Sequence, residues 1–142
     1  MTEVRTTSAT GGEKGVKEER FDLIPTGPLR ELAIHYGRGA LKYDDHQWRK
    51  GYEWGKSLAS LQRHTNAFWG GEDYDVCPVD EDGCVTVHPK TGESTVRQVE
   101  HGRACYNHTG SHHMVAAAWH SFTLLEFKDH FPQYDDRFKR EL

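Results

Sequence analysis

Three stretches of the chain carry apolar residues at intervals of three and four positions, which is the spacing of an amphipathic helix. The first covers residues 25–43, with Thr26 as the expected N-cap and Pro28 in the first turn. The second covers residues 56–69 and ends at two glycines, and the third covers residues 111–127, with Ser111 as the expected N-cap. The pattern therefore predicts three helices.

Each predicted helix has a stripe of residues that we expect to be buried. The stripes are Leu29, Leu32, Ala33, Tyr36 and Ala40 in the first helix, Leu58, Leu61, Thr65 and Phe68 in the second, and Met114, Ala118, Phe122 and Leu125 in the third. Three short helices leave further apolar residues to cover, so we expect the chain to form a homodimer or a homotetramer.

Residues 76–110 follow a different pattern. Val85 and Val87 alternate with polar residues before a PKTGE turn, and Val96 follows it, so a β-hairpin is expected. Residues 1–13 are small and polar and predict a flexible N-terminal segment, whereas residues 14–142 predict a single helical domain. The expected fold class is all-α: a helical bundle with a small β-hairpin insertion at about residues 76–110.

Composition and charge narrow the classes of function. The net charge is -4, which argues against binding to a nucleic acid polymer. No apolar run approaches the length of a membrane span, and no signal peptide is recognised, so we expect a cytoplasmic protein without a membrane partner. Three cysteines, an odd number, exclude a complete disulfide framework. Ten histidines are an unusual number for a chain of 142 residues and direct attention to metal sites.

Histidines and acids occur on or beside all three predicted helices. Glu31 and His35 are four residues apart and share a face, where they can hold a divalent ion or form an ordinary surface pair. Glu72 and Asp75 directly follow the second helix, as a solvated turn or as cation ligands. The candidate metal ligands are Glu31, His35, His64, Glu72, Asp75 and His113. Oxygen ligands with some imidazole suit Mg²⁺ or Mn²⁺.

A second candidate site consists of Cys77, Cys84, His88 and Cys105, which can bind Zn²⁺. Its spacing lacks the CxxC pair of common zinc sites. Simple buried or free thiols are therefore the favoured interpretation.

Basic and aromatic side chains supply candidate substrate contacts. The candidates are Lys14, Arg20, Lys42 and Arg63 for phosphate groups, and Tyr43 and Trp48 for stacking on a base. A solvated basic surface is the alternative for any single lysine. The chain has no P-loop, GxGxxG or GxSxG motif, so phosphate binding would depend on metal ions and side chains.

The segments RFDLIPTGPLRELAIHYGRGALKYDDHQWRKG, LQRHTNAFWGGEDYD and SHHMVAAAWHSFTLL occur in this order. Together they resemble the phage-encoded dATP/dGTP diphosphohydrolase family, which is linked to MazG-like and MazZ-like all-α nucleotide pyrophosphohydrolases. The resemblance implies a bundle of the MazG-like type that hydrolyses a purine (deoxy)nucleoside triphosphate to monophosphate and pyrophosphate, in the host cytoplasm if phage-encoded. The positions that match are Glu31, His35, Lys42, Tyr43, Trp48, His64, Glu72, Asp75 and His113.

The chain also differs from the MazG pattern, which has EExxE on one helix and ExxD on the next. Glu72 and Asp75 read as ExxD, but no EExxE precedes them, and His35 and His64 stand where a carboxylate site has acids. We expect Glu31 or Glu72 to act as the general base for an attacking water.

Two alternative functions stay open at this point. One is another His/Asp metal phosphohydrolase that acts on nucleotides and releases triphosphate or orthophosphate. The other is a non-enzymatic, zinc-stabilised interaction module, in which the helical histidines are only polar groups of the core.

Overall fold

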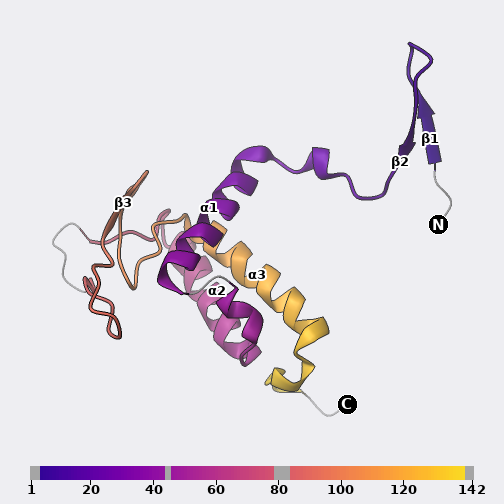
Figure 1. Cartoon of the computed structure of the whole chain (residues 1–142). Helices are drawn as coiled ribbons and strands as arrows, with labels where there is room; N and C mark the ends of the chain where they lie inside the picture. The colour runs from indigo at the N-terminus through magenta and orange to yellow at the C-terminus, as the bar shows by residue number, and fades with distance from the viewer. Residues whose placement is uncertain (1–3, 44–45, 79–83, 140–142) are drawn as a thin grey trace.

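The structure is a computed structural model that describes residues 4–43, 46–78 and 84–139, with Leu41 and Lys42 described by their backbone only. Within these ranges, three α-helices form the framework: α1 (Thr26–Lys42), α2 (Trp54–Trp69) and α3 (His113–His130). Helix α3 packs against both α1 and α2, with the larger contact to α2 (Figure 1). The three predicted helices are confirmed, and the chain is mostly helical with small hairpins. No helix in the described ranges has the length and apolar character needed to cross a bilayer.

The chain between the helices forms short connections. A 3₁₀ turn, η1 (Phe21–Leu23), precedes α1, another, η2 (Gln47–Lys50), lies between α1 and α2, and a third, η3 (Pro132–Tyr134), follows α3. Strands β1 (Val4–Thr7) and β2 (Glu13–Val16) pair in an antiparallel hairpin, which stands away from the helices in Figure 1. The flexibility expected of residues 1–13 stays a prediction.

The predicted hairpin of the 76–110 segment is confirmed, and a second hairpin follows it. Val87 and Ser94 pair across the expected turn, and the amide of Thr95 donates to the carbonyl of Thr86 at 2.9 Å. Strands β3 (Arg97–Val99) and β4 (Gly102–Ala104) then pair antiparallel. The segment packs beside the N-terminal end of α3 (Figure 1).

The predicted N-caps are wrong for two helices. Helix α3 begins one residue later than Ser111 would place it, because His112 is the N-cap and its Nδ1 accepts the amide of Met114 at 3.0 Å. The hydroxyl of Ser111 binds side chains of α1 instead. At α1 the N-cap position is Pro25, which has no side-chain cap, and Thr26 is already helical.

The predicted buried stripes are also largely wrong within one chain. Leu29, Leu58, Phe122 and Leu125 are 42% to 65% exposed, although Leu32 is buried as expected. The helices instead bury Trp54, Ser57, Val115, Ala116, Ala117, Thr123 and Phe127. The small residues of α3 let α2 approach closely, so the larger apolar side chains are left on the outer face. Because α3 is apolar on several sides, spacing alone did not identify the side that packs.

Candidate functional site

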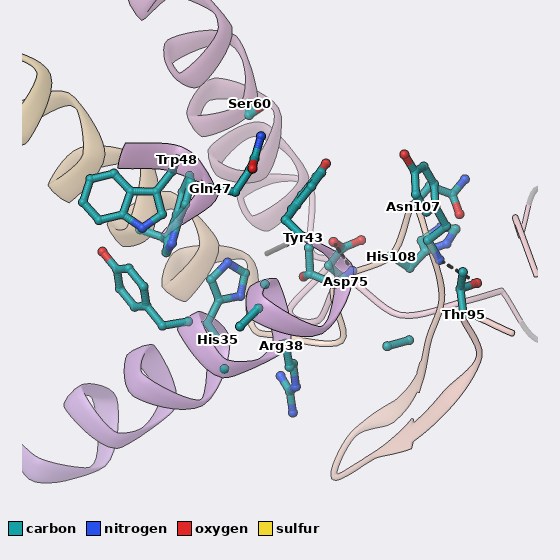
Figure 2. A pocket seen from close by; sticks show the side chains of 18 of the residues that line it. His35, Arg38, Tyr43, Gln47, Trp48, Ser60, Asp75, Thr95, Asn107 and His108 are labelled. Carbon is teal, nitrogen blue, oxygen red and sulfur yellow. Dashed lines mark hydrogen bonds between the residues drawn. The ribbon is translucent and has the colours of Figure 1, made fainter. Parts of the chain in front are cut away.

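A cavity of about 1250 Å³ lies between the three helices and the 76–110 segment. Side chains from α1, η2, α2 and α3 line it on one side, and residues 88–109 supply the other side. Figure 2 shows His35, Tyr43 and Trp48 on this lining together with Asp75 and His108. Pockets for small molecules usually measure about 300–1,000 Å³, so the space accommodates a ligand as large as a nucleotide.

Two histidines from facing helices are joined in a chain of hydrogen bonds. Nδ1 of His64 lies 2.8 Å from Nδ1 of His113, and Nε2 of His113 lies 2.9 Å from Oε1 of Glu72. His64 and His113 line the cavity, whereas Glu72 is exposed and lies behind His113. Because His113 uses its two nitrogens on opposite sides of the ring, His64 and Glu72 do not converge on one point.

His35 and Arg38 reach from α1 to the chain just before α3. Nδ1 of His35 and a terminal nitrogen of Arg38 both lie 2.7 Å from the Ser111 hydroxyl. The edge of the His35 ring contacts the indole of Trp119, with ring centroids 6.4 Å apart. These contacts fix one turn of α1 against α3 at the rim of the cavity.

Asp75 is a buried acid in the cavity lining, with 8% of its surface exposed. Its Oδ2 accepts the amide of Thr109 at 2.9 Å, and its backbone carbonyl accepts the amide of Gly110 at 2.6 Å. Gly110 has a φ of +80°, a conformation that favours glycine, and a Cβ there would lie 3.0 Å from that of Ala104. The loop therefore holds a carboxylate at a fixed place in the wall.

Burial disfavours the charged form of three histidines of the cavity, His35, His64 and His120. Burial, reinforced by the electrostatic effect of His64, lowers the pKa of His35 and of His120 to about 4. Burial also lowers the pKa of His64, although Asp75 opposes the shift. Neutral imidazoles can accept a proton or bind a metal ion at neutral pH.

The rest of the lining is strongly cationic. Among the residues that the structure describes, six basic residues line the cavity, against two acids, Asp75 and Glu93. The basic residues are Arg38, Arg49, Lys50, Lys56, Arg63 and Arg97. The guanidinium of Arg49 lies 4.5 Å from the centre of the Trp48 ring. Although the net charge of the chain is -4, this cavity favours a polyanionic ligand.

A sequence profile described as "dATP/dGTP diphosphohydrolase, N-terminal" matches residues 8–137. The chain belongs to this dATP/dGTP diphosphohydrolase family. The resemblance stated from the sequence is thereby confirmed, and the family name is that of a nucleotide hydrolase. No curated protein and no solved structure matches the chain.

The structure brings most of the predicted site residues of this diphosphohydrolase family member to one cavity. The residues that line it are His35, Tyr43, Trp48, Arg63, His64, Asp75 and His113. Glu31 lies exposed on α1, where its charge acts on Arg38. Lys14 is on β2, and Arg20 binds Asp22 at 2.7 Å, both exposed and away from the lining. The side chain of Lys42 lies outside the described residues. The roles of all these residues stay predictions.

The cysteines form a separate group beside the cavity, with one correction to the predicted ligand set. Ligand atoms of Cys77, Cys84, Cys105 and His108 all lie within 4.8 Å of one another, so the group could hold a metal ion. His88, which was expected as the fourth ligand, instead caps its own turn: its Nδ1 accepts the amides of Lys90 and Thr91. In the described ranges, no other set of three or more such side chains is as close.

Sequence reasoning missed three residues of this part of the molecule. His108 follows Cys105 at the CxxH spacing, a signal that was present but not used. Ser111 was interpreted only as a helix cap, and Arg97 was not considered because it lies outside the helices. Polar residues at the ends of an insertion are easily taken for loop residues, although they can face a site.

Proposed function

We propose that the chain hydrolyses purine (deoxy)nucleoside triphosphates such as dATP and dGTP to monophosphate and pyrophosphate, with Mg²⁺ or Mn²⁺. The observation that carries this proposal is the composition of the cavity of about 1250 Å³. Histidines and the buried Asp75 lie on its lining together with six described basic residues and exposed or half-buried aromatic rings. A triphosphate needs such cations, and a base needs such rings.

Asp75 is the residue that would hold a divalent ion in this cavity, because both nitrogens of His113 and the Nδ1 of His64 are engaged in hydrogen bonds. The protein therefore offers few simultaneous ligands. This fits Mg²⁺, which usually binds one or two carboxylates and completes its shell with waters and substrate phosphates. When bound, the ion neutralises phosphate charge and lowers the pKa of a water.

One tautomer pattern fits the hydrogen bonds of the two histidines. If Nε2 of His113 donates to Glu72, its Nδ1 can accept the Nδ1 proton of His64. The Nε2 of His64 is then an acceptor. We propose that His64 takes the proton of the attacking water and that Glu72 is a positioning residue that acts through His113. Glu31 remains an alternative base.

The basic residues would bind the phosphate groups, and Tyr43 or Trp48 would cover the base. Arg63 and Lys56 lie on the same helix as His64, and Arg97 comes from the 76–110 segment opposite. Substrate would therefore bridge two walls of the cavity. Lys14 and Arg20 would contribute only if their segment reached the cavity of another copy of the chain.

The test is a panel of all dNTPs and NTPs with Mg²⁺ or Mn²⁺, in which released pyrophosphate is measured. We expect dATP and dGTP to give the highest turnover, and His64→Ala to reduce it by about 10²–10⁴-fold as for loss of a general base. His130→Ala is the matched control, because His130 is exposed and pairs only locally with Glu126 at 3.4 Å. No turnover of any nucleotide by folded protein would contradict the proposal, and released triphosphate would favour the other phosphohydrolase class.

A homodimer or homotetramer, in a bundle of the MazG-like type, is part of the same proposal. Leu29, Phe122 and Leu125 lie on a shared groove between α1 and α3 and are 48% to 65% exposed. A second chain would cover these side chains. Light scattering of wild type and of Leu125→Glu tests this, since we expect the variant to be smaller in solution.

A zinc-stabilised interaction module is the second candidate function, and the Cys77, Cys84, Cys105 and His108 group favours it. In that case zinc would be present but no nucleotide would be hydrolysed. The nucleotide panel therefore separates the two candidates directly.

A further inference from the structure

Four potential soft ligands meet at the base of the 76–110 segment, and they come from three separate parts of the chain. Cys77 lies two residues after Asp75, Cys84 precedes the first hairpin, and Cys105 and His108 form a tight turn before α3. Sγ of Cys105 lies 3.0 Å from Nδ1 of His108, and all four ligand atoms lie within 4.8 Å of one another. Ligands of a tetrahedral zinc ion lie about 3.5–3.8 Å apart, so only small shifts would close the site.

We propose that Cys77, Cys84, Cys105 and His108 bind a structural zinc ion that fastens the 76–110 segment as one wall of the cavity. A set of three thiolates and one imidazole is a common structural zinc site, and it leaves no position open for a substrate. This site is independent of the Mg²⁺ or Mn²⁺ proposed for hydrolysis, which would use oxygen and imidazole ligands.

The surroundings of the group suit thiolates. Zinc with three thiolates has a net charge of about -1, and the guanidinium of Arg103 reaches Sγ of Cys84 at 4.0 Å. The carbonyl of Arg103 also accepts the amide of Cys77 at 2.8 Å, so the backbone of Arg103 is held beside that of Cys77.

The 76–110 segment also needs a cross-link, because it has little apolar core of its own. Although Ala104 at the end of β4 is buried, every residue from 84 to 103 is exposed or half-buried, so the two hairpins bury too little apolar surface to hold themselves in place. A metal ion that joins the start and the end of such a segment replaces the missing core.

The position of the group links it to the cavity. Cys77 lies two residues after Asp75, and His108 precedes Thr109, whose amide binds the Asp75 carboxylate at 2.9 Å. Cys105 and His108 themselves line the cavity. A zinc ion here would fix Cys77, two residues after Asp75, and His108, next to the Thr109 that binds the Asp75 carboxylate. It would also position the wall of the cavity that carries Arg97.

Metal analysis of the full chain tests the proposal without reference to turnover. We expect one zinc ion per chain after exhaustive dialysis, and visible thiolate-to-metal absorption when Co²⁺ replaces zinc. Cys84→Ser and His108→Ala should each lose the zinc. His108→Cys should retain it with four thiolates, and His88→Ala is the matched control that should retain it too.

Each outcome decides the matter. Wild-type chain that takes up neither zinc nor Co²⁺ from excess free metal, with helical circular dichroism intact, would overturn the proposal. So would zinc content unchanged in both Cys84→Ser and His108→Ala, and loss of zinc from His88→Ala would overturn the ligand set. If the variants fail to fold, the Co²⁺ spectrum of wild type alone still decides, because tetrahedral thiolate ligation has its own absorption.

Discussion

The helical side of the cavity and the cysteine group (Cys77, Cys84, Cys105 and His108) both bring histidines and ionisable side chains together, but their geometries differ. Nδ1 of His113 and its neighbours are engaged in a line of hydrogen bonds that ends on the exposed Glu72. In the cysteine group, the four ligand atoms all lie within 4.8 Å of one another. Thiolate and imidazole ligands that converge on one point enclose a metal ion and stabilise the fold. A few oxygen ligands that lie apart leave coordination positions for water and substrate. The two regions should therefore respond differently to the same treatments.

Removal of weakly bound metal should have the largest effect. After passage over a chelating resin, we expect turnover to vanish and to return with added Mg²⁺ or Mn²⁺, while the zinc content stays unchanged. The measurements are pyrophosphate release and metal analysis on the same sample. Full turnover in the absence of Mg²⁺ and Mn²⁺ would erase the distinction between the two regions.

Replacement of Asp75 by Asn should reduce turnover by about 10²–10³-fold, comparable to loss of one preorganised charged group. The amide oxygen can still accept the Thr109 amide, so folding and zinc content should be retained. Glu93→Gln is the control, since Glu93 is the other acid among the described residues of the lining and is exposed. Equal turnover in the two variants would remove Asp75 from the site.

The Glu72→Gln variant should have a smaller effect, about tenfold on kcat with KM nearly unchanged, because Glu72 acts through His113. It should also shift the acidic limb of the pH–rate profile, which a purely structural role would not move. Kinetics across a range of pH measure both effects. An unaltered pH profile together with wild-type kcat would exclude the relay.

Stability against pH should show the smallest effect. The pKa values of His35 and His120 are about 4 in the folded chain but near 6.5 when unfolded, so the unfolded state binds more protons between these values. Stability is therefore complete above pH 6.5 and falls toward pH 4, by about 2–3 kcal/mol for each histidine.

Denaturant unfolding at several pH values measures this slope. His120→Asn should flatten it relative to wild type, whereas His130→Asn, at an exposed position, should not. Comparison between these variants cancels the acid release of zinc, which all three proteins share. An identical slope for wild type and His120→Asn would show that His120 is not held neutral by burial.

The sequence was a good guide to the helices and a poor guide to their faces. Period and stop signals gave α1, α2 and α3 within a few residues, because such signals are local. Helix α3 packs with Ala116 and Ala117 buried, and the pattern of a helix that is apolar on several sides does not reveal this. The apolar residues expected inside, such as Leu125, are therefore exposed in the single chain.

The candidate site shows the same division. His64 and Asp75 could be chosen from residue type and position, and they do meet in one cavity. The CxxH spacing of Cys105 and His108 favours His108 over His88, but the engagement of His88 in its own turn depends on how the hairpins fold back. His88 is used by its own turn, so His108 takes the place beside Cys105.

Gly110 lies between the two regions. Its φ of +80° and the close approach of Ala104 leave little room for any other residue at this position. Gly92 has a similar φ of +74° but open space around it. In a saturation scan of both positions, Gly92 should accept asparagine, whereas nearly every replacement of Gly110 should be lost. Because a Cβ does not fit there, Gly110 should tolerate substitution as poorly as Asp75, whose backbone carbonyl accepts its amide.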